Sequence, residues 1–301
     1  MRVAAVQLEA VVGDVAANLA ACERLADAAA REGAEWIILP EFFTTGMGFL
    51  PELAGHALPP DGPAAELLSA LAKRHGAVVG GSFLCHDADG HVRNAFFLAT
   101  PAGVAGRHDK DTPTMWENCF YLGGTDDGLI EAGGLTAGVA LCMEFNRTRT
   151  VERLRGKADL VVGGSCAWGA PKGLPFYRRL QSSVERYTDW AAPFAKLVGC
   201  PVVEAAHCGS LRCRTPLLPL DYVTELGGGA NVCDAAGNVL ARRAKDEGAG
   251  FVVADVEGGR VASTERVPAG FWVQELDPVS RLGWHVQGWH GRRWYRRHVA
   301  P

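Results

Sequence analysis

Short apolar runs alternate along this chain with longer segments whose apolar residues recur every three or four positions. Runs of the first kind predict buried strands, and segments of the second kind predict helices that cover a sheet. The pattern therefore predicts an α/β protein with a mixed sheet. The predicted strands are Arg2–Leu8, Trp36–Leu39, Ala77–Leu84, His91–Thr100, Gly103–Lys110, Thr136–Cys142, Ala158–Ser165, Pro201–Ala206, Ala230–Asp234, Asn238–Arg242 and Phe251–Val256.

Four segments have helical spacing. The first follows Asn18, a candidate N-cap, and stops at Gly33. The others are Gly62–His75, residues 147–155, and Phe176–Leu197, which is expected to be one long helical segment. Asp89-Gly90 predicts a tight hairpin between two of the strands.

The chain contains no Pro/Ser-rich linker, so we expect one domain over residues 1–260 and a tail over residues 261–301. The tail holds half of the chain's eight tryptophans, and from Arg281 to Pro301 it has five arginines and no acidic residue. Aromatic rings can pack inward while arginines stay hydrated. We therefore expect this basic, Trp-rich tail to pack on the domain or on a partner subunit.

Composition narrows the classes of protein that remain. The 301 residues are 48% apolar and 21% charged, and the net charge of −4 argues against a general nucleic-acid binder. No apolar stretch approaches the ~20 residues of a membrane helix. Met1 leads directly into a predicted strand, and the nine cysteines have no repeated spacing. The expectation is a cytoplasmic protein with reduced thiols and no membrane partner.

Three chemically capable residues follow predicted strands, namely Glu41, Lys110 and Cys142. Reactive groups collect at the carboxyl ends of strands in α/β proteins, because the strands fix the backbone there. A cysteine nucleophile needs a base for its proton and a donor for the oxyanion that forms. A glutamate and a lysine supply both functions without a histidine.

The segments around these residues resemble three signatures of the nitrilase (carbon–nitrogen hydrolase) superfamily, in the family's order. They are Leu39-Pro40-Glu41-Phe42-Phe43, Lys110 with Glu117 and Gly123-Gly124, and Gly138-Val139-Ala140-Leu141-Cys142-Met143-Glu144. The resemblance covers roughly residues 1–257. It implies an α-β-β-α sandwich, with two mixed sheets face to face and helices outside, and a homodimer or larger homo-oligomer.

The resemblance also implies a mechanism without metal or organic cofactor. Cys142 would attack the carbon of a nonpeptide C–N bond, Glu41 would be the general base, and Lys110 would stabilise the oxyanion. The backbone N–H of Met143 would assist Lys110, and Glu117 would orient the lysine or the substrate. The intermediate would be a thioester that water hydrolyses.

Two departures from the family pattern concern the substrate. Cys142 is followed by Met143-Glu144-Phe145-Asn146, where many amidases of the family have an aromatic residue and an aspartate, and the rest of the nitrilase-branch motif is absent. The family's Arg-Ala-x-Glu segment is replaced by residues 192–196. Trp168 stands where the family often lines its pocket, and a packing role fits it equally well. An amide or carbamoyl substrate is favoured, with a nitrile as the alternative.

Other interpretations have weaker support. Cys200, His207, Cys208 and Cys213 lie close together but lack the spacing of a zinc knuckle. The tail's aromatic and basic residues could bind single-stranded nucleic acid instead of packing. Residues 163–167 lack the last glycine of a serine nucleophile elbow. A fold without activity is disfavoured by the intact Glu41, Lys110 and Cys142.

Overall fold

The computed structural model describes residues 1–173, 176–217 and 220–301. Within that part of the chain, twelve strands form one hydrogen-bonded sheet, whose main path runs β5-β4-β3-β2-β1-β9-β8-β7-β6. These path strands are β1 (Arg2–Leu8), β2 (Trp36–Ile38), β3 (Val78–His86), β4 (Val92–Thr100), β5 (Gly103–Asp109), β6 (Leu129–Ala132), β7 (Leu135–Leu141), β8 (Leu160–Ser165) and β9 (Val202–His207).

Three further strands extend this sheet, and two form a separate hairpin. Strand β14 (Gly250–Asp255) pairs antiparallel with β1, and β12 (Asn231–Cys233) joins β13 (Val239–Arg242) to β9. Strands β10 (Ser210–Arg214) and β11 (Asp221–Glu225) pair only with each other among the described residues.

The sheet consists of two halves joined by a very short contact. Strands β1 and β9 pair in parallel only through Gln7 with Ala206 and Leu8 with His207. Side chains from both halves meet in one buried cluster that includes Val3, Ile38 and Phe96 from one half and Val139 and Val162 from the other. The halves therefore pack face to face, although hydrogen bonds make them one continuous sheet rather than two separate ones.

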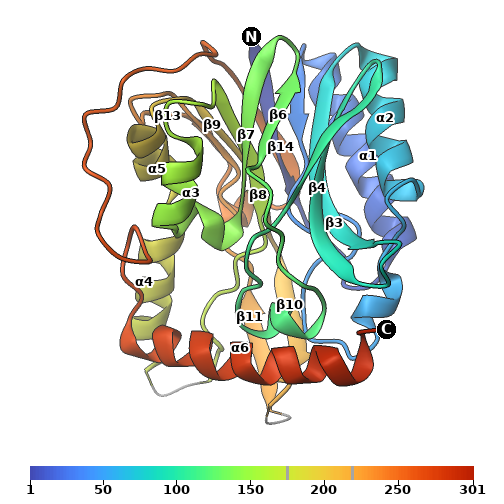
Figure 1. The fold of residues 1–301 in the computed structure, drawn as a ribbon, viewed down its shortest axis with the longest axis vertical. Helices are drawn as coiled ribbons and strands as arrows, with labels where there is room; N and C mark the ends of the chain where they lie inside the picture. The colour runs from blue at the N-terminus through green and yellow to red at the C-terminus, as the bar shows by residue number, and fades with distance from the viewer. Residues whose placement is uncertain (174–175, 218–219) are drawn as a thin grey trace.

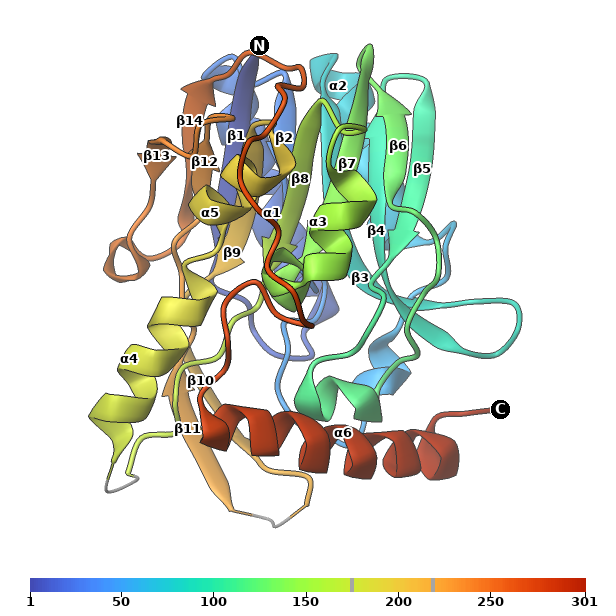
Figure 2. The same cartoon turned by 60° about the vertical axis from the view of Figure 1, so that its left-hand side comes forward.

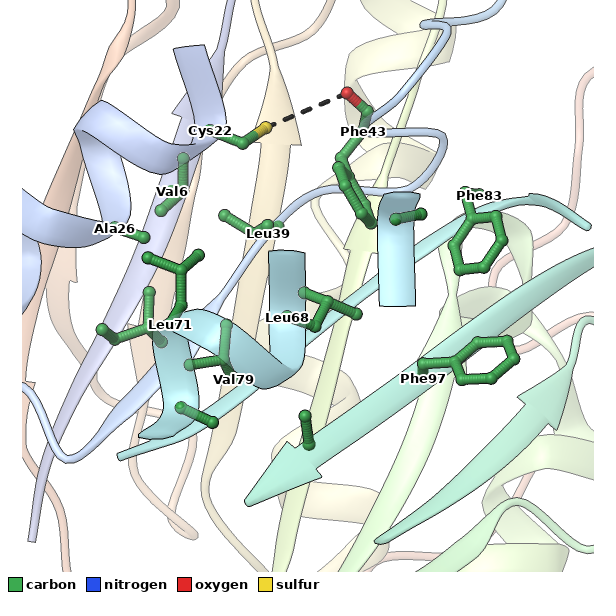
Figure 3. Close-up of a cluster of buried hydrophobic side chains, with 14 of the residues drawn as sticks. Val6, Cys22, Ala26, Leu39, Phe43, Leu68, Leu71, Val79, Phe83 and Phe97 are labelled. Carbon is green, nitrogen blue, oxygen red and sulfur yellow. Dashed lines mark hydrogen bonds between the residues drawn. The ribbon is translucent and has the colours of Figure 1, made fainter. Parts of the chain in front are cut away.

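Helices cover the two outer faces (Figure 1). Helices α1 (Val15–Arg31) and α2 (Pro63–His75) pack on one half through a buried cluster that includes Cys22, Leu39, Leu68 and Phe83 (Figure 3). On the other half lie α3 (Thr148–Leu154), α4 (Tyr177–Thr188) and α5 (Ala191–Val198). The α/β class and the mixed sheet covered by helices are thus as predicted, whereas twelve of the described strands form one continuous sheet where the family resemblance implied two.

The last helix, α6 (Pro278–His298), runs crosswise beneath the ends of the strands (Figure 2). Gly291 permits this close approach, because a Cβ there would lie 2.6 Å from the Cβ of Asn118. The Tyr295 hydroxyl accepts a hydrogen bond of 3.1 Å from the backbone N–H of Val92. No helix in the described ranges has the length and apolar character needed to cross a membrane.

Several sequence expectations were wrong in detail. Asp14, not Asn18, caps α1, since its carboxylate accepts the N–H of Ala17 while Asn18 is buried and holds backbone groups of Val11 and Thr44. The long helical segment expected over 176–197 is divided between α4 and α5 by a break after Thr188. The hairpin β10–β11, strand β6 and helix α6 were not predicted. The three strands are short, and the apolar residues of α6, such as Leu282, Val286 and Trp289, were interpreted as part of a basic, Trp-rich tail.

Candidate active site

Glu41 lies in a turn just after β2, with its side chain fully buried. Its Oε1 accepts hydrogen bonds from Asn94 Nδ2 at 2.9 Å and from Lys110 Nζ at 2.8 Å. Its Oε2 accepts the backbone N–H of Cys166 at 3.1 Å. Burial raises the pKa of Glu41 to about 7, although the nearby Lys110 ammonium opposes the shift.

Lys110 follows β5 and is also fully buried, so its charge must be met by protein groups. Its ammonium donates to Glu41 Oε1 and to Glu117 Oε2, both at 2.8 Å, and to Thr114 Oγ1 at 3.2 Å. The two carboxylates hold the pKa of Lys110 well above its usual range, despite burial. The lysine is therefore a fixed cation at neutral pH.

Glu117 belongs to a short 3₁₀ helix, Met115–Cys119. Besides Lys110, its Oε2 accepts the backbone N–H of Thr114 at 2.9 Å and the hydroxyl of Tyr121. One carboxylate oxygen thus collects three donors, which fixes the carboxylate against the lysine.

Cys142 is the first residue of a second 3₁₀ helix, Cys142–Asn146, directly after β7. Its φ of 52° lies in the left-handed region that non-glycine residues rarely adopt, and its side chain is only 4% exposed. Such backbone strain persists where surrounding structure enforces it. Burial and the charge of Glu41 raise the pKa of the Cys142 thiol well above its usual range, with Lys110 opposing, so the resting form is the thiol.

Cys142 opens into a cavity of ≈ 220 Å³, which we call the Cys142 cavity. Met143 and Trp168, both expected from the sequence to contact the substrate, line it as well. Most other lining side chains are apolar or aromatic, including Met115, Leu180, Tyr187 and Trp190. The structure thus brings all six residues singled out in the sequence to one region: Glu41, Lys110, Glu117, Cys142, Met143 and Trp168.

A carboxylate that sequence reasoning treated only as a departure connects the loops of the site. Glu144 is fully buried, and it accepts the backbone N–H of Leu141 through Oε2 at 2.9 Å and that of Asp111 through Oε1 at 3.0 Å. One of these residues precedes Cys142 and the other follows Lys110. The carboxylate therefore connects the turn that holds Cys142 to the loop that follows Lys110.

The imidazole of His108 lies between the carboxylates of Glu144 and Asp126. The imidazole lies 3.1 Å from Glu144 Oε2 through Nε2 and 2.5 Å from Asp126 Oδ1 through Nδ1. The two carboxylates outweigh desolvation and raise the pKa of His108 to about 9, and the histidine and Arg153 hold the pKa of Glu144 far below its usual range. His108, Glu144 and Asp126 therefore form an imidazolium–carboxylate network at neutral pH.

Sequence reasoning missed the neighbours that complete the site. Asn94 and Cys166 reach Glu41 from β4 and from the end of β8, at sequence separations of 53 and 125 residues. His207 Nε2 lies 2.6 Å from the Glu41 carbonyl oxygen, and burial lowers the pKa of His207 to about 4. Their only sequence signal was a polar residue within or at the end of an apolar strand. No group of three or more His, Cys, Asp or Glu residues in the described ranges is arranged to hold a metal.

The chain is similar in sequence to a family of hydrolases and to a curated protein described as a hydrolase. The model of the carbon–nitrogen hydrolase family matches residues 2–266. A curated Pseudomonas protegens protein, described as hydrolase in pqqF 5'region, is 28% identical over 167 residues. That match spans 54% of this chain and 58% of the relative, so it covers little more than half the relative's length.

Solved structures share the fold at low sequence identity. The amidase from Nesterenkonia sp. AN1, in a mutant form with acrylamide added at its active-site cysteine, is 20% identical, with a TM-score of 0.67. The alignment covers 85% of this chain and 93% of that chain. A CN-hydrolase superfamily protein from Xanthomonas campestris, with an arsenic adduct in its active site, is 21% identical, with 85% and 90% coverage and a TM-score of 0.62.

Proposed function

We propose that this chain, which belongs to the carbon–nitrogen hydrolase family, hydrolyses a small nonpeptide amide through a covalent thioester on Cys142. One observation carries the proposal. The buried Glu41–Lys110–Glu117 cluster lies beside a strained cysteine that opens into a substrate-sized cavity. A base, a fixed cation and a nucleophile are the groups that acyl transfer to sulfur requires.

In the first half-reaction, the ionised Glu41 carboxylate takes the proton of the Cys142 thiol as sulfur attacks the amide carbon. The C=O bond becomes an oxyanion, which Lys110 Nζ and the backbone N–H of Met143 stabilise. When the tetrahedral intermediate collapses, the C–N bond breaks and Glu41 returns its proton to the leaving amine. A thioester on Cys142 and free ammonia or amine remain.

The second half-reaction consumes water. Glu41, ionised again, removes a proton from a water molecule that attacks the thioester carbon. The same donors stabilise the second oxyanion, the C–S bond breaks, and the sulfur recovers a proton from Glu41. Glu117 never exchanges a proton in this scheme, and its hydrogen bond of 2.8 Å keeps Lys110 in place.

The experiment that tests this function traps the intermediate. Rapid acid quenching during turnover of a small amide should give a protein mass increased by the acyl group, located on Cys142 by peptide analysis. Cys142→Ala should show no adduct and no ammonia release. An active Cys142→Ala variant would overturn the mechanism.

A nitrile substrate is the second candidate, because the residues would serve a thioimidate intermediate equally well. Ammonia release from matched amides, carbamoyl amines and nitriles distinguishes the two reactions. We expect amides to react faster than nitriles of the same chain length, and the reverse order would make the protein a nitrilase.

Nine cysteines without a repeated spacing fit a cytoplasmic enzyme, and we further propose a homodimer or larger homo-oligomer.

A further inference from the structure

Resting on the proposed amidase function, we infer that the substrate's acyl group is uncharged and apolar, about as large as an aromatic ring, and that helix α6 forms the wall that selects it. The evidence is the size and lining of the Cys142 cavity. A cavity of 150 Å³ lined by apolar side chains is known to hold benzene. The ≈ 220 Å³ here leaves room for a ring-sized group and the reacting carboxamide.

The charge around this cavity is equally informative. None of the described residues that line it is an Asp, Glu, Lys, Arg or His. Lys110 does not line this cavity and is already paired with two carboxylates. An anionic acyl group would therefore lose its hydration without meeting a free cation, which costs several kcal/mol.

A second, more polar cavity of ≈ 370 Å³ shares Trp168 and Val184 as walls with the first. It could serve a charged group only if one of its cations were available. However, Arg242 is paired with Asp189 at 3.0 Å and Lys245 with Glu225 at 3.5 Å. A carboxylate placed in the neighbouring cavity would therefore compete with Asp189 or Glu225 for these cations.

Helix α6 closes the Cys142 cavity with one face. Val279, Ser280, Gly283 and Gln287 recur at helical spacing and line the cavity together. Ser280 anchors this face, because its hydroxyl donates to Asp277 at 2.6 Å and lies 3.3 Å from the hydroxyl of Tyr187 on α4. The helix therefore lies at a fixed distance from the nucleophile.

Two lining side chains carry buried polar atoms that have no hydrogen-bond partner among the residues the structure describes, namely Gln287 Oε1 and Trp168 Nε1. One is an acceptor and the other a donor, and both are uncharged. The neutral carboxamide of the substrate offers both a donor and an acceptor for them, and pairing with it requires no desolvated charge. This agrees with the absence of charge around the cavity.

The test uses two amides of nearly equal shape. Succinamate and 4-methylpentanamide differ only in that a carboxylate replaces an isopropyl group. We expect kcat/KM for 4-methylpentanamide to exceed that for succinamate at least ~100-fold, equivalent to about 2.7 kcal/mol. Ratios within tenfold, or a preference for succinamate, would overturn the inference.

A charge placed on α6 should change this ratio. Gln287→Lys introduces a cation at the cavity wall and should raise relative turnover of succinamate at least tenfold. Leu282→Lys is the matched control, because this side chain is on the same helix but 63% exposed and outside the cavity lining. If both variants, or neither, change the ratio, α6 does not select the acyl group.

A measurement independent of turnover separates this inference from the proposed function. Alkylation rates of Cys142 by iodoacetamide and by iodoacetate are each divided by the rates with glutathione. We expect the neutral reagent to be favoured at least tenfold after this correction, even if no amide is hydrolysed. Equal corrected rates would show that the cavity accepts anions, whatever the fate of the amidase proposal.

Discussion

At the scale of single residues, the outstanding feature is a buried lysine between two buried carboxylates. Removing one member of such a group costs more than the pair contributes, because the remaining charges stay buried and unpaired. Lys110→Met leaves Glu41 and Glu117 facing each other. We therefore expect the variant to lose activity by at least ~10²–10³-fold, through loss of oxyanion stabilisation. It should also lose stability, most strongly at high pH, where the Glu41 carboxylate is ionised and has lost its partner.

A double variant separates these two effects. Lys110→Met with Glu117→Gln leaves only one carboxylate, so its midpoint of urea unfolding should recover toward wild type while turnover stays absent. Steady-state kinetics and urea titrations at pH 6 and pH 9 provide the measurements. Turnover of Lys110→Met within threefold of wild type would exclude the role assigned to the lysine.

The buried Glu41 carboxyl predicts a pH profile. Because burial raises its pKa to about 7, the carboxylate needed as base forms only as pH rises through that value, and kcat/KM should rise with it. Asn94 donates to the charged form, so Asn94→Val should move this limb to higher pH. Kinetics between pH 5 and pH 9 measure this rising limb in the wild type and in Asn94→Val. An unchanged midpoint in the variant would contradict the assignment of the limb to Glu41.

At the scale of elements, two strand-end loops must be held in register. Glu144 does this with both carboxylate oxygens, one on Leu141 N and one on Asp111 N. A glutamine can accept through only one oxygen, so Glu144→Gln should release one loop from the other. We expect kcat to fall ~10–100-fold with KM within threefold, because the substrate cavity itself is not changed.

A charge-matched control accompanies this variant. Glu131→Gln removes an exposed carboxylate that accepts the hydroxyl of Thr136, outside the lining of the Cys142 cavity, and its kinetics should equal wild type. Glu144→Asp keeps both acceptors and should retain more kcat than the glutamine. Equal losses in the two Glu144 variants would point to a packing defect instead of lost alignment.

At the scale of the whole molecule, α6 packs on the rest of the fold, lines the Cys142 cavity and exposes a stripe of apolar side chains. Its outer face exposes Leu282, Val286 and Trp289, with Arg293 4.2 Å above the Trp289 ring. Its inner face buries Tyr295 and packs Trp294 against Phe49. The inner face thus packs against its own chain. The outer stripe is the surface that we predict to pack against a partner subunit.

Deletion of Arg281–Pro301 tests both faces. Loss of the inner contacts should lower the melting temperature, since buried aromatic side chains contribute ~2–3 kcal/mol each, and should open the Cys142 cavity. Loss of the outer stripe should shift the assembly toward smaller species in sedimentation. Trp289→Ser alone should change only the sedimentation, and an unchanged profile in both variants would remove the tail from the interface.

The sequence by itself determined the elements with strong local patterns and the residues at their ends. Strands such as Arg2–Leu8 and Gly103–Lys110 were predicted within one or two residues, because apolar runs between polar residues have few other ways to be buried. The motifs around Glu41, Lys110 and Cys142 led to the family that the comparison shows. Their catalytic roles remain predictions for the experiments above.

The tertiary structure decided what depends on contacts between distant residues. Asn94 and Cys166 form hydrogen bonds to Glu41, Glu144 connects two loops, and α6 lines the Cys142 cavity. No local sequence pattern identifies these residues as neighbours of the site. The cap of α1 was decided in the same way, since Asn18 is buried against Thr44 while Asp14 faces the first turn. Burial supplies the physical reason: a polar group enclosed by the fold must find its partner wherever the chain brings one.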